Sequence, residues 1–153
     1  MPEGSLANKA KTDVTNVDAL IIGAGFSGLY QLLSLRDKLG LRAKVVEAGD
    51  GVGGTWYWNR YPGARCDSES HSYSYYFDKE LLEEWQWSER YPGHAEVVKY
   101  LNYAADKLDL KRDIHFNSKV VSAHYSQSQN KWVIKTEDQR EFVCTYLITA
   151  VGC

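Results

Sequence analysis

The chain has 153 residues, which is enough for one domain with its own hydrophobic core. Its 18 basic and 20 acidic side chains nearly balance, which excludes the strongly basic surface of a nucleic-acid-binding protein. No apolar run approaches the roughly 20 residues of a membrane-spanning helix, and three widely spaced cysteines fit neither a disulfide framework nor a zinc site, which favours a reducing, cytoplasmic location.

The first folded element is expected after a polar N-terminal segment. Residues 1–16 lack the apolar core of a secretory signal, so we expect a flexible N-terminal arm there and one folded domain over residues 17–153. Residues 17–22, with the sequence VDALII, are mostly apolar and predict a short, buried parallel strand.

A glycine-rich turn, GAGFSG at residues 23–28, follows this strand. Leucines then recur at helical spacing until Gly40, which stands where a helix C-cap is expected. The next segment, AKVVEA at residues 43–48, predicts a second strand with Glu47 near its C-terminal end. Together they predict a βαβ unit of about 30 residues, the size of a dinucleotide-binding half.

The glycines and Glu47 each have a physical reason in such a unit. Gly23 permits the tight turn, Gly25 lets the backbone approach a pyrophosphate, and Gly28 allows the helix to pack closely on the strand. The phosphates then meet free N–H groups at the positive end of the helix dipole. Glu47 is placed to bind ribose hydroxyls and disfavours a 2′-phosphate, so this unit should hold FAD or NAD rather than NADP.

The remaining elements complete an α/β pattern. Residues 49–77 show no periodicity, whereas a helical stripe of apolar residues from His94 to Leu108 predicts a helix. Residues 114–116 predict a third parallel strand, and residues 120–125, 131–136 and 140–144 predict a small antiparallel meander. Residues 146–152, YLITAVG, predict a further, central parallel strand. The expected fold is therefore a Rossmann-like α/β domain with a small antiparallel β-meander.

The loop GGTWYWNRYPGARCD, residues 53–67, crowds aromatic and cationic side chains behind a glycine pair. Ordered loops with many large side chains are often sites. The overlapping segment GDGVGGTW, residues 49–56, resembles the second FAD signature of two-dinucleotide-binding flavoproteins. From Gly54 to Asp67 the loop resembles the pattern of Baeyer–Villiger monooxygenases: Gly, any residue, Trp, four residues, Tyr or Phe, Pro, Gly, three residues, Asp. The resemblance extends over about residues 17–152 and is to the branch that contains phenylacetone, steroid and large-ring ketone monooxygenases.

This resemblance implies an FAD enzyme that uses NADPH and O2 to convert a small-molecule ketone into an ester or lactone through a C4a-peroxyflavin. The residues that it assigns to cofactor binding are Gly23, Gly25, Phe26, Ser27, Gly28, Glu47, Gly54, Thr55, Trp56, Tyr57, Trp58, Arg65, Cys66, Asp67, Tyr73 and Val120.

The resemblance also divides these residues by the part of the cofactor that they meet. Residues 23–28 hold the pyrophosphate, and residues 55–58 lie along the FAD. Asp67 and Tyr73 approach the flavin ring, with Asp67 in a supporting catalytic role. Residues 65–67 face the nicotinamide of NADP, and Val120 contacts the adenine through its backbone.

Alternatives stay open beside this interpretation. Tyr57 and Trp58 could be loop packing rather than cofactor contacts, and four histidines show no metal-ligand spacing. Other flavin monooxygenases, N-hydroxylating or dimethylaniline-type, share the first glycine motif, although the W-x4-YPG-x3-D run is not expected in them. A second glycine motif for NADPH, the linker motif and the catalytic arginine of the resembled family are not found. We therefore expect a partial FAD-binding domain that is inactive alone, or a non-catalytic orphan FAD-binding domain.

Overall fold

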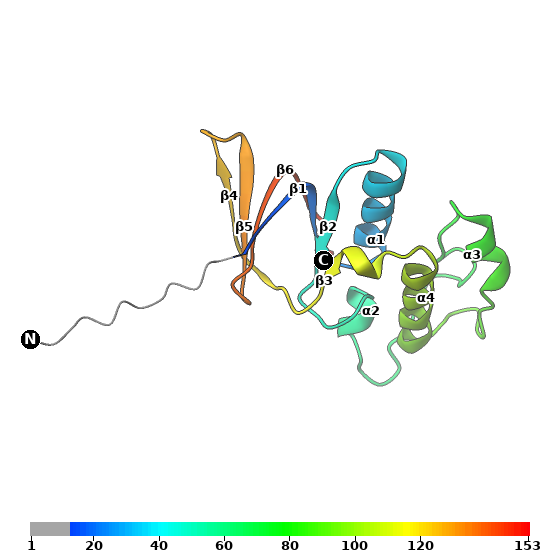
Figure 1. The fold of residues 1–153 in the computed structure, drawn as a ribbon. Helices are drawn as coiled ribbons and strands as arrows, with labels where there is room; N and C mark the ends of the chain where they lie inside the picture. The colour runs from blue at the N-terminus through cyan, green and yellow to red at the C-terminus, as the bar shows by residue number, and fades with distance from the viewer. Residues whose placement is uncertain (1–12) are drawn as a thin grey trace, which may run out of the picture.

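The computed structural model describes residues 13–153 and contains one mixed six-stranded sheet (Figure 1). In sheet order the strands are β3 (Ile114–His115), β2 (Ala43–Val46), β1 (Val14–Ile22), β6 (Glu141–Thr149), β5 (Lys131–Thr136) and β4 (Val120–Ser126). The first four strands of this order are parallel, and β6, β5 and β4 pair antiparallel. The predicted α/β class with an antiparallel extension is confirmed.

The helical elements are α1 (Phe26–Leu33), a π-helical turn (Ser34–Lys38), α2 (Thr55–Trp58), α3 (Lys79–Glu84), α4 (His94–Lys107) and a 3-10 turn (Lys111–Asp113). Figure 1 shows the β4–β5 hairpin at one end of the molecule and these helices gathered at the other. Within residues 13–153, no helix is both long enough and apolar enough to cross a membrane.

The hydrophobic core lies on both faces of the central strand β1. Ala19 and Ile21 pack in one cluster with residues of α1 and α4, whereas Leu20 packs in a second cluster with Ile134 and Phe142 of the antiparallel extension. Successive side chains of a strand point to opposite faces, so one apolar run serves both clusters.

Two predicted boundaries at the sheet are wrong. Strand β1 begins at Val14, because residues 14–16 pair with residues 141–143 of β6, so they do not belong to an N-terminal arm. The rest of the predicted arm, residues 1–12, lies outside the described residues. The predicted strands 140–144 and 146–152 form one strand, β6, which pairs with β5 through its first half and with β1 along its length.

Helices α2 and α3 were not predicted from the sequence. The signal for α3 was present, because Asp78 is its N-cap and its carboxylate accepts a hydrogen bond from the Leu81 N–H at 3.0 Å. The predicted helix end at Gly40 is confirmed, since Gly40 follows the π-helical turn with a φ of +66°.

Candidate cofactor site

The site begins where strands β1, β2 and β6 end at the same edge of the sheet. The Gly23 N–H donates to the Val46 carbonyl at 2.9 Å, and the Ala150 N–H donates to the Ile22 carbonyl at 2.8 Å. Gly23 has a φ of +103°, and a Cβ there would lie 2.5 Å from the Ala150 oxygen. Only glycine fits, which confirms that this position is a tight turn.

The turn leads directly into the N-terminus of α1. Gly25 is the N-cap, no side chain within residues 13–153 caps this end, and the first turn contains no acidic residue. A Cβ at Gly28 would lie 1.8 Å from the Gly23 oxygen, so the helix can begin this close to the strand only with glycine at that position. The first backbone N–H groups of α1 therefore remain available to an anion.

A second glycine loop packs against the first. Gly53 and Gly54 have φ values of +143° and +54°, and the Gly53 N–H donates to the Ala24 carbonyl at 3.0 Å. A Cβ on Gly54 would lie 2.9 Å from the Gly25 Cα. The two loops thus meet backbone to backbone and leave no side chain between them.

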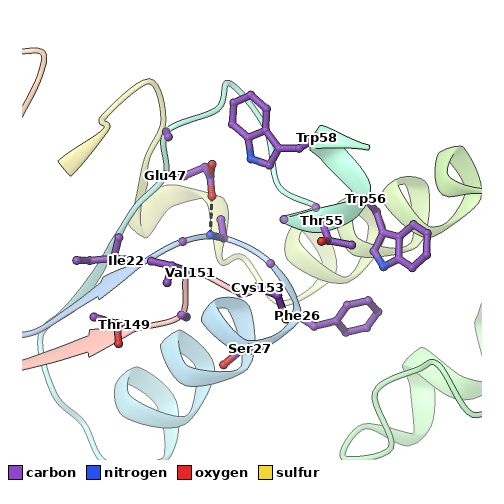
Figure 2. Close-up of a pocket in the computed structure, with 18 of the residues that line it drawn as sticks. Ile22, Phe26, Ser27, Glu47, Thr55, Trp56, Trp58, Thr149, Val151 and Cys153 are labelled. Carbon is purple, nitrogen blue, oxygen red and sulfur yellow. Dashed lines mark hydrogen bonds between the residues drawn. The ribbon is translucent and has the colours of Figure 1, made fainter. Parts of the chain in front are cut away.

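Glu47 ties these loops together. Its side chain is buried, and its carboxylate accepts a hydrogen bond from the Ala24 N–H at 2.7 Å, drawn as a dashed line in Figure 2. A second hydrogen bond comes from the Gly49 N–H at 2.8 Å. Each carboxylate oxygen has a second lone-pair direction, and Glu47 lines the cavity described next. A ribose contact stays a prediction, and the structure adds a structural role that the sequence did not indicate.

A cavity of about 920 Å³ opens over these strand ends, within the range of small-molecule sites. Figure 2 shows residues of the glycine turn, α2 and the end of β6 around it. The predicted site residues that line it are Gly23, Gly25, Phe26, Ser27, Glu47, Gly54, Thr55, Trp56, Trp58, Tyr73 and Val120.

One wall of the cavity is aromatic. The Trp56 Nε1–H donates to the Tyr73 hydroxyl at 3.0 Å, and the Tyr73 and Phe26 rings meet edge to face with centroids 4.9 Å apart. Such interlocked rings form a rigid apolar surface suited to a flat ring system. Trp58 also lines the cavity, and its side chain is largely exposed.

The other five predicted residues do not line this cavity. Gly28 packs beneath the turn, and Tyr57 packs on the second glycine loop, where its hydroxyl donates to Asp50 at 2.5 Å. Arg65 pairs with Glu89 at 2.7 Å, Cys66 is buried, and Asp67 is exposed. The assigned contacts of residues 65–67 with the nicotinamide and flavin ring stay predictions.

The cavity also contains residues that sequence reasoning missed. They are Ile22, Val46, Ala48, Asn59, Ser118, Lys119 and residues 149–153, whereas Ala24 and Gly53, which also line it, belong to the two predicted glycine loops. The end of β6 could have been found, because ligands of open α/β sheets bind outside the carboxyl ends of parallel strands. Lys119 had no local signal, since only the fold places residues 118–120 beside the end of β2.

The fold and the site together define a Rossmann-like dinucleotide-binding domain. A family model described as an NAD(P)-binding Rossmann-like domain matches residues 21–84. The chain is 47% identical over 90% of its length to acetone monooxygenase (methyl acetate-forming) of Gordonia sp. strain TY-5. It is 44% identical over 93% of its length to a Baeyer–Villiger monooxygenase of Pseudooceanicola batsensis.

Two further comparisons widen this picture. A phenazine N-monooxygenase of Lysobacter antibioticus is 44% identical over 92% of the chain. The solved structure of oxidized steroid monooxygenase bound to NADP superimposes with a TM-score of 0.87 over 90% of the chain at 46% identity. The chain spans 26% of the length of each of these four proteins. The predicted resemblance to Baeyer–Villiger monooxygenases is confirmed.

Proposed function

We propose that this chain forms the FAD-binding part of a Baeyer–Villiger-type monooxygenase. The whole protein would use NADPH and O2 to convert a small-molecule ketone into an ester or lactone. The observation that supports this proposal most is the cavity where two glycine loops and the uncapped N-terminus of α1 meet an aromatic wall. Similarity to acetone and Baeyer–Villiger monooxygenases supports the ketone as substrate.

The residues present fit FAD part by part. A pyrophosphate needs donors without side chains in the way, and the close approach of Gly25 and Gly54 leaves only backbone there. Glu47 offers carboxylate oxygens at the end of β2 for a ribose. Phe26, Trp56 and Tyr73 offer an apolar wall for the flavin ring.

When bound, FAD would supply the electron transfer and oxygen activation of the reaction. The chain's own residues would bind and orient the cofactor and would exclude water from it. The N–H groups at the start of α1 would bind the phosphates, and the Glu47 carboxylate keeps the two glycine loops in place around them. The interlocked Trp56 and Tyr73 side chains would keep water away from the bound ring system.

The cofactor proposal is tested at Ser27, which is exposed, lines the cavity and lies in the first turn of α1. Ser27→Asp adds a negative charge that suits the helix N-terminus but repels a pyrophosphate. We expect FAD affinity, measured by flavin fluorescence titration, to fall at least about tenfold, or ~1.4 kcal/mol, while the melting temperature holds or rises.

Ser27→Asn is the matched control, since the asparagine side chain has the same shape as aspartate but no charge. It should retain FAD affinity within about threefold, or ~0.6 kcal/mol. Absence of FAD binding by the unaltered chain, or equal affinity of all three proteins, would contradict the assignment of this cavity to FAD.

Ketone oxygenation is a proposal for the whole protein, and we expect residues 1–153 alone to form no ester from cyclic or aryl ketones. Asp67 is proposed to support the reaction rather than FAD binding. In the whole protein, Asp67→Ala should leave FAD content unchanged but slow flavin reduction by NADPH, followed by stopped-flow absorbance. Unchanged reduction and ketone turnover would leave Asp67 without the proposed role.

N-oxygenation is a second candidate, favoured by the similarity to phenazine N-monooxygenase. The same cofactor site suits both reactions, so product analysis must separate them. The whole protein would be supplied with a ketone and a phenazine in parallel. An ester from the ketone would support ketone oxygenation, and an N-oxide from the phenazine would support N-oxygenation. A cytoplasmic location also belongs to the proposal and is supported by three free cysteines.

A further inference from the structure

A continuous series of aromatic rings leads from the cofactor cavity to the surface near α3. It consists of Trp56, Tyr73, Phe26, Tyr100, Trp87, Trp85 and Tyr103, and we call it the ring chain. Along the path the ring centroids lie 5.9 Å (Trp56–Tyr73), 4.9 Å (Tyr73–Phe26), 6.1 Å (Phe26–Tyr100), 5.4 Å (Tyr100–Trp85) and 5.4 Å (Trp85–Tyr103) apart. Trp87 lies beside the path, 5.0 Å from Tyr100 and 5.6 Å from Trp85.

The chemical character of these rings matters as much as their spacing. All but Phe26 are tryptophan or tyrosine, the side chains most readily oxidised by one electron after cysteine. Phe26 is harder to oxidise and acts as a bridge between the Tyr73 and Tyr100 rings, which both contact it. Because electron transfer slows steeply with distance, rings this close together form a fast path.

The inner end of the ring chain is the cavity wall itself. Trp56, Tyr73 and Phe26 line the cavity, and Trp56 and Tyr73 share a hydrogen bond of 3.0 Å. Tyr100 is buried, which raises the pKa of its phenol, so it remains protonated at neutral pH.

The outer end has a proton acceptor. The Tyr103 hydroxyl donates to Glu84 Oε2 at 2.5 Å, and Lys107 Nζ donates to the same oxygen at 2.6 Å. The Glu84 side chain is half exposed. A phenol that has lost an electron becomes a strong acid, so a carboxylate at this distance takes its proton and leaves a neutral tyrosyl radical at the surface.

We propose that the ring chain transfers one-electron oxidising equivalents from the cofactor cavity to Tyr103. An oxygen-derived one-electron oxidant in the cavity gains one electron from the Trp56–Tyr73 pair. Tyr103 finally loses one electron, and its phenolic proton passes to Glu84. A thiol in solution then donates a hydrogen atom to Tyr103 and becomes a thiyl radical, while Glu84 releases its proton to water. The inference rests on the proposed function only for the source of the oxidant.

The test places an oxidant in the cavity without relying on FAD. Cys153 is the one exposed cysteine within residues 13–153 and lines the cavity, whereas Cys66 and Cys144 are buried. A ruthenium polypyridyl maleimide is attached there. A light flash with an electron-accepting quencher converts the ruthenium to its oxidised form, which regains its electron from the protein. Transient absorbance detects the tyrosyl radical, and mass spectrometry of spin-trap adducts locates it.

We expect adducts at Tyr103 in the unaltered chain and their loss in Trp85→Phe, which removes the oxidisable ring next to Tyr103 while retaining its packing. Trp132→Phe is the matched control, since Trp132 packs on Tyr125 in the β4–β5 hairpin, away from the ring chain. That variant should give the same Tyr103 adducts as the unaltered chain.

Glu84→Gln keeps the rings in place and removes the proton acceptor, so tyrosyl formation should slow markedly. If Trp85→Phe unfolds, this variant tests the ring-chain proposal in its place. The proposal is overturned if Tyr103 is not oxidised in the unaltered chain, if oxidation stops at the exposed Trp58, or if neither Trp85→Phe nor Glu84→Gln alters it. If the chain fails to bind FAD but Tyr103 is still oxidised, the result contradicts the proposed function and leaves the ring-chain proposal standing.

Discussion

Two walls of the cofactor cavity are built in opposite ways. At the glycine wall, formed by Gly23, Gly25, Gly53 and Gly54 with Gly28 packed beneath it, backbone packs on backbone, and an added Cβ would meet main-chain atoms within 3.1 Å at four of these five positions. At the inner part of the ring chain, contact is made by interlocked side chains. Backbone contacts have no rotamers with which to adjust, whereas side chains can repack. The glycine wall should therefore tolerate substitution least.

The largest effect should come from Gly28→Ala. Its Cβ would lie 1.8 Å from the Gly23 carbonyl oxygen, so either the turn or the start of α1 must move. We expect a loss of unfolding free energy at or above the top of the ~1–3 kcal/mol range for overpacking, measured by urea denaturation. Gly51→Ala is the control, because its Cβ would only touch the Tyr57 ring at 3.4 Å. Equal stability of both variants would remove the distinction between the walls.

Glu47→Gln tests the same wall through its hydrogen bonds. The amide presents one oxygen and one NH2 group to the N–H groups of Ala24 and Gly49, so one bond to a charged acceptor is lost. We expect destabilisation of about 1.5–3 kcal/mol by urea denaturation, with weaker FAD binding. The exposed Glu137→Gln should change neither. If Glu47→Gln is as stable as the unaltered protein but binds FAD more weakly, Glu47 acts at the ribose and does not stabilise the glycine loops.

The glycine wall could be predicted from the sequence because its rules are local. The positions of Gly23, Gly25 and Gly28 between a strand and a helix indicate a turn that excludes side chains. Gly53 and Gly54 were also recognised as a loop beside the cofactor. Their packing against Ala24 and Gly25 was not, since it depends on two segments separated by almost 30 residues of chain.

Other features depended on contacts that no local pattern encodes. Arg65 turns toward Glu89 and the Tyr91 carbonyl, 24 and 26 residues further on, so residues 65–67 do not line the cavity. Strand β6 continues through the polar Thr145 because β1 pairs with it on both sides of that residue. Pairing partners, rather than hydrophobicity, decide where such a strand ends.

Tyr75→Phe probes the side-chain contacts behind the aromatic wall and should have a smaller effect. The buried Tyr75 hydroxyl donates to the Phe26 carbonyl at 2.7 Å and so connects the aromatic residues to the first turn of α1. Removing it should cost about 0.5–1.5 kcal/mol of unfolding free energy. Tyr125→Phe, which removes an exposed 3.2 Å bond to Asn130, should cost close to nothing. A loss as large as that of Gly28→Ala would mean that both walls are equally intolerant.

The smallest effect is expected away from both walls, at Asp113. Its carboxylate accepts hydrogen bonds from Lys44 Nζ at 2.6 Å and Arg36 Nη1 at 3.0 Å. Partial burial alone would raise the pKa of Asp113, but the bonds and charges of Lys44 and Arg36 outweigh it and lower the pKa below the usual value. Arg36 also donates to the Leu108 carbonyl after α4 at 3.0 Å, so the ion pair fastens this helix end to the sheet.

The sign of the pH dependence follows from that lowered pKa. A carboxyl that is more acidic in the folded state stabilises the protein above its unfolded pKa, and this stabilisation is lost as the pH falls through the folded value. Because Asp113 is partly solvated, we expect Asp113→Asn to cost less than about 1 kcal/mol at pH 7. The difference between the two proteins should shrink between about pH 5 and pH 2, as Asp113 becomes protonated. Urea denaturation of both proteins across this range measures it, and a difference that does not vary with pH would show that packing, rather than charge, holds this helix end.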